Sequence, residues 1–132
     1  MITVYVIGKT KPLFVKEGIK EYLTRLGKYT PLTYKEIEKL PLCKGFIIAL
    51  DVTGKAFSSE DFSLFLNKKM FEHKDLTFVI GGAEGFDKTF LKEVDFRLSL
   101  SLMTFPHELV RVLFLEQLYR AFTLIKGEQY HK

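Results

Sequence analysis

The chain has 132 residues, 47% of them hydrophobic and 27% charged, which is the composition of an ordinary globular domain. We expect one domain, residues 1–132, that is long enough to bury a core. The net charge of +4 permits an RNA partner without requiring one, and a lone cysteine excludes a disulfide framework and favours a reducing compartment. The N-terminal apolar run is too short for a signal peptide or a membrane span, so we expect a cytoplasmic protein without a membrane partner.

Strand and helix patterns alternate along the chain. In order, we predict a strand at 2–7, a helix at 13–29, strands at 32–37 and 46–50, a helix from Ser58 or Ser59 through Met70, a strand at 76–80, a short helix capped by Asp87, a strand at 96–100, and a long helix from Pro106 to a stop at Gly127. This alternation predicts an α/β fold with a mainly parallel sheet and flanking helices. Ligands of such sheets bind beyond the carboxyl ends of the strands.

The last helix is more apolar than a surface helix needs to be. A helix that covers one side of a domain requires only an apolar stripe, yet between 109 and 125 only five residues are polar: Arg111, Glu116, Gln117, Arg120 and Thr123. We therefore expect more than one side of this helix to be covered, by a second copy of the chain in an isologous homodimer. The alternative is a central helix buried within one monomer.

Three segments follow predicted strands and are candidates for a ligand site: 50–54, 80–85 and 100–105. None carries a complete P-loop or dinucleotide fingerprint, and no His or Cys spacing predicts a metal site. The glycines of GGAEG permit either close approach to a ligand or a tight turn. The apolar loop LSLMTF predicts either a pocket for a flat ring or a buried core loop. The residues alone therefore predict an α/β dimer with a small-molecule pocket.

The same segments, taken together, resemble one family. LDVTGK (50–55), FVIGGAEG (78–85), LSLMTFPHELVRVLFLEQLYRAFTLIKG (100–127) and YHK (130–132), together with VYVIGKTK at the N-terminus, are similar to RlmH. That family consists of SPOUT-class methyltransferases, which methylate N3 of a pseudouridine in large-subunit rRNA. The resemblance extends over nearly the whole chain.

The resemblance implies a deep trefoil knot at the C-terminal end, a rare exception to unknotted topology, and a homodimer. The knot would bind the cofactor S-adenosyl-L-methionine, and the substrate would be 23S rRNA within an assembled ribosome. By match to the family, the cofactor contacts would be Leu50, Gly81, Leu100, Ser101, Leu102, Met103, Thr104 and Phe105.

The terminal residues would complete the catalytic site, against the partner subunit's cofactor. His131 is the candidate base for the N3 proton, because imidazole is neutral near pH 7, and Tyr130 would stack on or hydrogen-bond the target base. Arg111 and Lys132 would contact RNA. The alternatives are a frayed terminus for the tail and, for Arg111, an ion pair with an acidic residue across the dimer.

Two departures from the family pattern leave a second function open. The region between Ile37 and Phe46 is short, where the family usually has a further helix, and the tail ends in Lys132 rather than arginine, which loses the bidentate guanidinium. The alternative function is a non-catalytic knotted protein that binds the ribosome or assists its assembly.

Overall fold

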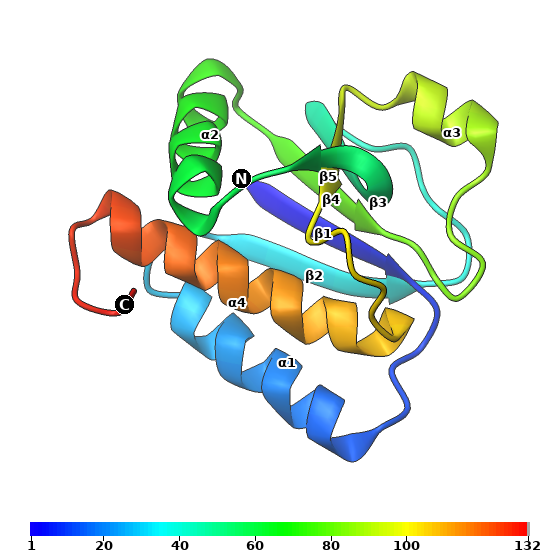
Figure 1. The fold of residues 1–132 in the computed structure, drawn as a ribbon, viewed down its shortest axis with the longest axis horizontal. Coiled ribbons are helices and arrows are strands. Elements are labelled where there is room, and N and C mark those ends of the chain that lie inside the picture. The colour runs from blue at the N-terminus through cyan, green and yellow to red at the C-terminus, as the bar shows by residue number, and fades with distance from the viewer. Residues whose placement is uncertain (132) are drawn as a thin grey trace.

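In the computed structural model, which describes residues 1–131, five strands form one parallel sheet in the order β2-β1-β4-β3-β5 (Figure 1). The strands are β1 (Ile2–Ile7), β2 (Leu32–Ile37), β3 (Phe46–Ala56), β4 (Leu76–Ile80) and β5 (Phe96–Ser99). The predicted α/β class and parallel sheet are confirmed. Because all five strands run the same way, their carboxyl ends meet at one edge of the sheet.

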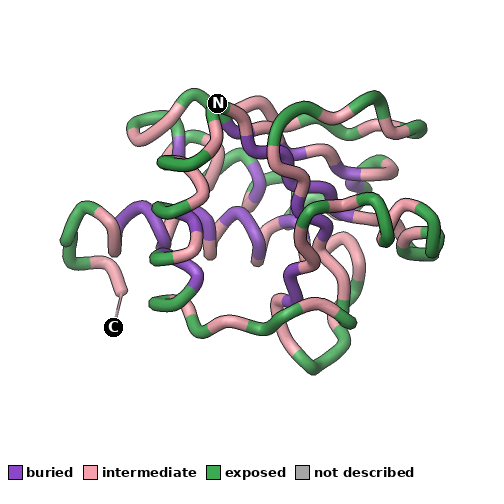
Figure 2. Tube along the Cα trace, turned by 90° about the horizontal axis from the view of Figure 1, so that it is seen from above, coloured by how far each residue is buried: buried purple, intermediate pink, exposed green. Residues whose placement is uncertain are grey.

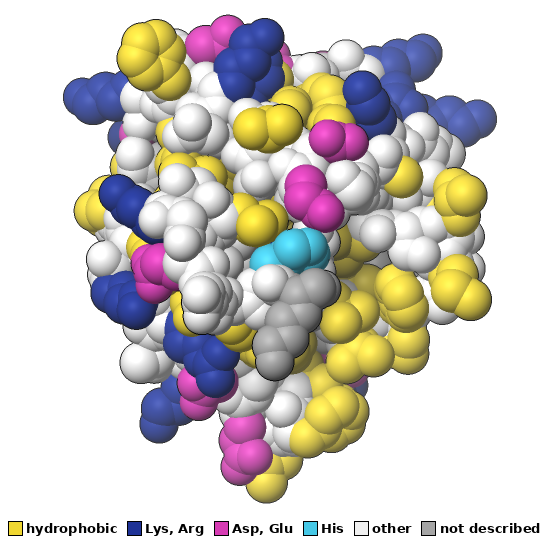
Figure 3. All heavy atoms as spheres, turned by 60° about the vertical axis from the view of Figure 1, so that its left-hand side comes forward, with side chains coloured by type: hydrophobic (Ala, Val, Ile, Leu, Met, Phe, Trp, Pro, Cys, Tyr) yellow, Lys and Arg dark blue, Asp and Glu magenta, His cyan; other side chains and the backbone are white. Residues whose placement is uncertain are grey.

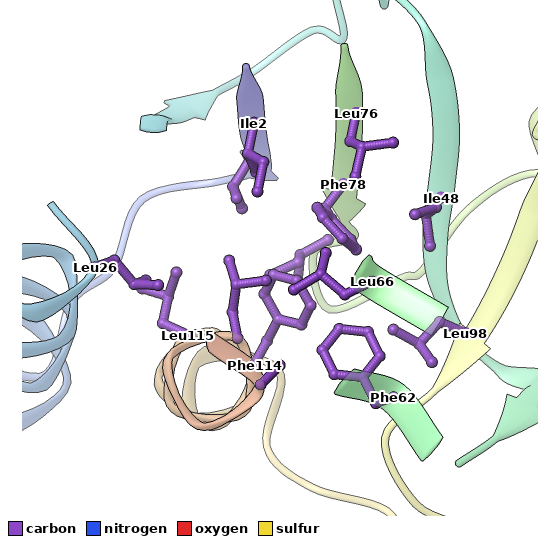
Figure 4. Packing of buried hydrophobic residues seen from close by; sticks show 14 of the residues in the cluster. Ile2, Leu26, Ile48, Phe62, Leu66, Leu76, Phe78, Leu98, Phe114 and Leu115 are labelled. Carbon is purple, nitrogen blue, oxygen red and sulfur yellow. The ribbon is translucent and has the colours of Figure 1, made fainter. Parts of the chain in front are cut away.

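Of the four helices in residues 1–131, α1 (Leu13–Leu26), α2 (Ser59–Glu72) and α4 (His107–Ile125) pack on one face of this sheet. The fourth helix is α3 (Lys88–Glu93). Figure 4 shows Ile48 of β3 and Phe78 of β4 pointing toward Phe114 and Leu115 of α4, with Phe62 of α2 beside them. Buried residues accordingly run along the central strands and α4, and exposed residues lie at the periphery (Figure 2).

Helix α4 is covered on two sides by helices of its own chain. It packs between α1 and α2, and no residue from His107 to Ile125 is fully exposed. A Cβ on Gly18 of α1 would lie 3.0 Å from a methyl carbon of Val112, so α1 and α4 approach each other closely at this glycine. Much of the apolar excess of α4 is therefore satisfied within the monomer, and the homodimer stays a prediction.

Several predicted boundaries need correction. Helix α1 ends at Leu26 rather than Tyr29, β5 ends at Ser99 rather than Leu100, and Pro106 is the N-cap of α4 rather than its first residue. The predicted stop of α4 is confirmed, because Gly127 follows the helix with φ +69°. No helix in residues 1–131 has both the length and the apolarity to cross a bilayer.

The largest difference lies in β3, which extends to Ala56 and does not end at Leu50. Its pairing with β5 shifts register between Leu50 and Lys55, as at a β-bulge. Gly54 lies against the backbone of β5, where a Cβ would approach the carbonyl carbon of Arg97 to 2.5 Å. The segment 50–54 is therefore a bulge within a long strand, and not a loop beyond a short one.

Candidate functional site

The loop between β5 and α4, residues 100–105, is the common wall of two hollows at the carboxyl edge of the sheet. The small hollow, of about 130 Å³, lies toward β3, and the large hollow, of about 330 Å³, lies toward α2. Both are lined by Leu98, Ser99, Leu100, Ser101 and Phe105. The small hollow is also lined by Leu50, Asp51, Val52, Met103, Thr104 and Val110, and the large hollow by Phe57, Ser58, Ser59, Phe62, Leu113, Phe114 and Gln117.

Most of the residues predicted to contact a cofactor meet at the small hollow. Its lining includes Leu50, Leu100, Ser101, Met103, Thr104 and Phe105. Gly81 and Leu102 do not line it. Gly81 directly follows Ile80, which pairs with Leu50 in the sheet, so it lies at the same edge. Residues far apart in the sequence are thus brought together by the parallel register of β3, β4 and β5.

The loop itself is held by a serine turn and carries apolar side chains to the surface. The Ser99 hydroxyl donates to the Ser101 carbonyl oxygen (2.9 Å), and the Ser101 hydroxyl accepts from the Met103 N–H (2.9 Å). The side chains of Leu102 and Met103 are 90% and 73% exposed. The loop is therefore not a buried core loop, and its apolar residues are available to a ligand or a partner.

The GGAEG segment forms a tight turn. The N–H of Gly85 donates to the carbonyl oxygen of Gly82 (3.0 Å), and Gly85 has φ +71°, a conformation that favours glycine. A Cβ on Gly82 would lie 3.1 Å from the carbonyl oxygen of Ile7 at the end of β1. Of the two interpretations of this segment, the tight turn is confirmed, and it places Gly81 beside the end of β1.

The C-terminal tail folds back along α4 and is anchored there (Figure 1). The Tyr130 hydroxyl donates to Glu116 Oε2 (2.9 Å), and the Tyr130 ring meets that of Tyr119 edge-on, with 4.8 Å between centroids. Burial and hydrogen bonding, including the bond to Glu116, raise the pKa of the Tyr130 phenol, which therefore stays a protonated donor. Through Tyr130 the tail is ordered and not frayed. Lys132 lies outside the described residues.

His131 lies between a cation and an anion. Its Nδ1 is 2.9 Å from a guanidinium nitrogen of Arg120, and its Nε2 is 3.5 Å from Glu60 Oε1 on α2. Because arginine only donates, Nδ1 is the acceptor and the proton of the neutral ring is on Nε2. Figure 3 shows a histidine side chain at the surface of the molecule, with acidic side chains on one side of it and hydrophobic side chains on another.

A line of hydrogen bonds connects the large hollow to this tail. The Ser59 hydroxyl donates to Gln117 Oε1 (2.7 Å), and Gln117 Nε2 donates to Glu116 Oε1 (2.9 Å). Glu116 Oε2 accepts from Arg120 (2.7 Å) as well as from Tyr130. The sequence patterns did not predict that Gln117, Glu116 or Ser59 belongs to the site. In the sequence, Glu116 and Gln117 differ from their neighbours only as polar residues within an otherwise apolar helix, and Ser59 differs only as a candidate helix cap.

Arg111 occupies a different place from the one expected of an RNA contact. Its side chain is fully buried and donates to the Thr10 hydroxyl (2.6 Å) and to the Ile7 carbonyl oxygen (3.0 Å), with Glu36 Oε2 3.6 Å away. The expectation that Arg111 contacts RNA is therefore corrected, because its guanidinium does not reach the surface. The alternative predicted an ion pair with an acidic residue across the dimer; the structure shows an acidic partner, Glu36, but within the same chain.

Comparison with known proteins places this geometry in a family. Residues 41–131 match a family model described as "Predicted SPOUT methyltransferase". Two similar proteins are the ribosomal RNA large subunit methyltransferases H of Coprothermobacter proteolyticus, 45% identical over 137 residues, and of Carboxydothermus hydrogenoformans, 41% identical over 157 residues. Both alignments cover 99% of this chain and 99% of the relative.

This chain belongs to the family of ribosomal RNA large subunit methyltransferase H, within the SPOUT methyltransferases. The matched region begins before β3 and so contains both hollows and the tail. Members of the family differ in length, since one alignment spans 137 positions and another 157. The Coprothermobacter relative has nearly the same size as this chain, so a short chain occurs elsewhere in the family.

One solved structure has a fold similar to that of this chain. It is described as a probable methylase family protein from Haemophilus influenzae Rd KW20, and it superposes on this chain with a TM-score of 0.63. The match covers 99% of this chain and 70% of that chain, at 11% sequence identity. At this identity the likeness concerns the fold alone.

Proposed function

We propose that this protein transfers a methyl group from S-adenosyl-L-methionine to N3 of a pseudouridine in 23S rRNA. The observation that carries the proposal is the small hollow, where six of the eight residues matched to the cofactor contacts meet at the carboxyl edge of a parallel sheet. Such edges are where ligands of α/β sheets bind. Membership in the family of large-subunit rRNA methyltransferases supplies the reaction and the class of substrate.

The residues of the small hollow fit a cofactor with a flat base and a polar chain. Leu50, Leu100 and Phe105 offer apolar surface, while Ser101 and Thr104 bring hydroxyl groups. A hollow of about 130 Å³ is below the 300 Å³ typical of small-molecule sites, so the cofactor would also cover the exposed face of the loop at Met103. When bound, S-adenosyl-L-methionine supplies an activated methyl group.

In this proposal the residues of the tail handle the proton of the target base. His131 would remove the N3 proton as the nitrogen is held in line with the methyl group, and Tyr130 would stack on the base or donate a hydrogen bond to it. In the structure His131 Nδ1 accepts from Arg120, and Nε2 carries the proton. The base role therefore requires the tail to leave Arg120 before reaction.

If the C-terminal tail leaves α4 of its own chain before reaction, it is free to enter the active site of a second subunit. We propose a homodimer in which the tail of one subunit completes the cofactor site of the other, and a deep trefoil knot formed by the chain around the loop 100–105. The exposed side chains of Leu102 and Met103 support an interface at this loop, since apolar groups gain from being covered. The substrate would be the assembled ribosome in the cytoplasm, with Lys132 against phosphate.

The test is transfer of labelled methyl to ribosomes that lack the modification, with cofactor binding measured separately by calorimetry. The proposal requires both cofactor binding and label in large-subunit rRNA. A protein that binds the cofactor and ribosomes but transfers no label would instead be the non-catalytic ribosome-binding protein. The ordered tail and the polar residues around it favour the enzyme over this second candidate.

A further inference from the structure

The large hollow lies beside the proposed cofactor site and has no role in the function as described so far. Its volume of about 330 Å³ is in the range of small-molecule sites. One side is aromatic, with Phe62 and Phe114 buried beneath it and Phe57 and Phe105 only partly covered. The other side is polar, formed by serine hydroxyls and the carboxamide of Gln117. A flat ring with polar edges fits such a lining better than a flexible apolar chain does.

The two hollows are positioned as a bimolecular transfer requires. They share Leu100, Ser101 and Phe105, so a ligand in each would meet across the same wall. Group transfer needs the reacting atoms about 3–3.5 Å apart, which only adjoining sites provide. A donor in the small hollow therefore leaves the large hollow as the place for the acceptor.

The polar side of the large hollow is pre-oriented. The Gln117 carboxamide is held on one side by the Ser59 hydroxyl (2.7 Å) and on the other by Glu116 (2.9 Å). Among residues 1–131 these two bonds use one lone pair and one N–H, leaving one acceptor site and one donor on the amide. An amide with both capacities matches a pyrimidine, whose ring carries carbonyl oxygens and N–H groups.

In the position that the structure shows, the tail of the same chain also adjoins the large hollow. Ser59, which lines it, directly precedes Glu60, and Glu60 Oε1 lies 3.5 Å from His131 Nε2. Glu116, which binds Gln117, also binds Tyr130 (2.9 Å). Hydrophobic side chains gather near a histidine on this face of the molecule (Figure 3). The aromatic wall and the amide thus lie beside the docked tail of their own chain, which in the proposed dimer leaves and is replaced by the tail of the partner.

We infer that the large hollow binds the target pyrimidine, flipped out of the RNA, with Gln117 donating its remaining N–H to a ring carbonyl oxygen. This inference rests on the proposed function, because it assigns the acceptor of the same transfer. It specifies the ligand as a single unstacked uracil-type base, read at its edge by Gln117 and held on its face by aromatic side chains. Two other occupants are outcomes of the test: the base of the cofactor, and a segment of a second copy of the chain.

Two variants of the full-length protein test the inference, Gln117→Ala and Leu113→Trp. The first removes the edge contact, and the second fills the large hollow from a residue that does not line the small one. We expect Gln117→Ala to lower kcat/KM for ribosomes about 3- to 10-fold, the effect of one uncharged hydrogen bond, mostly through kcat. We expect Leu113→Trp to lower kcat/KM more than 10-fold. Asn67→Ala, an exposed amide on α2, is the matched control and should behave as wild type.

Two further measurements distinguish which of the three ligands occupies the large hollow. Calorimetry with S-adenosyl-L-methionine should give dissociation constants within about twofold of wild type for both variants, and light scattering should give the wild-type mass. A larger loss of cofactor affinity would assign the hollow to the cofactor, and a change in mass would assign it to a second copy; either result overturns the inference. If both variants transfer methyl as fast as the wild-type protein, the inference is wrong and the proposed function stands. If the wild-type protein itself transfers no methyl, the proposed function is wrong as well.

Discussion

The buried Arg111 of α4 reaches Glu36 of β2, whose side chain is 28% exposed, with 3.6 Å between a guanidinium nitrogen and Glu36 Oε2. Thr10 links them, since its hydroxyl accepts from Arg111 and donates to Glu36. The pair joins the start of α4, directly after the loop 100–105, to β2 at the far edge of the sheet. The position of the loop therefore depends on a charge pair distant from it in the sequence.

Removing the guanidinium of Arg111 should destabilise the protein strongly. The variant Arg111→Ala removes the donor to the Thr10 hydroxyl and to the Ile7 carbonyl oxygen, while Glu36 keeps its bonds from Thr10. A buried polar group left without its partner costs about 1–3 kcal/mol. Urea unfolding measures the loss. Arg25→Ala is the control, because Arg25 pairs with Glu21 at the surface and such pairs contribute about 0–1 kcal/mol. Equal losses for the two variants would contradict the role of the Arg111–Glu36 pair.

The bulge in β3 predicts a contrast between two glycines. In Gly54→Ala the new Cβ would lie 2.5 Å from the Arg97 backbone, so we expect a loss of about 1–3 kcal/mol, as for other overpacked sites. In Gly27→Ala the nearest atom would be 3.4 Å away and φ is −58°. That change should be neutral or stabilise by up to about 1 kcal/mol. Thermal unfolding of both variants measures the two changes in stability. If Gly54→Ala is as stable as the wild-type protein, β3 does not approach β5 so closely at residue 54.

Stability should fall in alkaline solution because of Tyr34. Burial, followed by the nearby Glu36, raises the pKa of its phenol above the ordinary value of about 10. Below pH 10 both the folded and the unfolded state are protonated, so Tyr34 gives no pH dependence. Above pH 10 the unfolded state loses the proton first, and the free energy of unfolding decreases as pH rises toward the folded pKa.

The variant Tyr34→Phe isolates this effect. It should lose less stability than wild type between pH 9.5 and about 11, a range set by the ordinary tyrosine pKa, while the two proteins keep a constant difference below pH 9. Urea unfolding at a series of pH values is the measurement. Parallel curves for wild type and variant throughout this range would mean that the Tyr34 phenol ionises as readily in the folded protein as in the unfolded chain.

Mixing two inactive variants tests whether the tail acts in the partner subunit. His131→Ala lacks the proposed base, and Thr104→Trp blocks the small hollow, so each homodimer should transfer no methyl. If the tail acts across the interface, half of the randomly mixed dimers carry one complete site, and activity returns to about one quarter of wild type. A mixture that stays inactive, with heterodimers demonstrated by mass, would mean that each tail serves its own subunit.

Much of the fold follows from local patterns in the sequence. The apolar run of β4 and the caps Ser58 and Asp87 mark their elements, because burial and side-chain capping leave a direct trace in residue type. The extension of β3 beyond Leu50 could not be predicted this way. Val52, Thr53 and Gly54 resemble a turn. They stay within the strand because Leu50 and Lys55 on either side of them pair with Leu98 of β5, more than forty residues away.

The site was predictable only in part, for the same reason. The cofactor residues came from resemblance, and strand register brings Leu50 to the loop 100–105, as parallel strands require. The burial of Arg111 was not predictable, because an arginine within an apolar helix is equally consistent with a surface contact or an internal ion pair. Its partners Thr10 and Glu36 lie on segments that nothing local connects to α4.

The central claim is tested most directly by locating the transferred methyl group. Ribosomes lacking the modification are incubated with the protein and labelled S-adenosyl-L-methionine, and the 23S rRNA is digested and analysed by mass spectrometry. The account predicts label on N3 of one pseudouridine, and none when Thr104→Trp replaces wild type. Label on another position or another RNA, or no label despite measured cofactor binding, would contradict it.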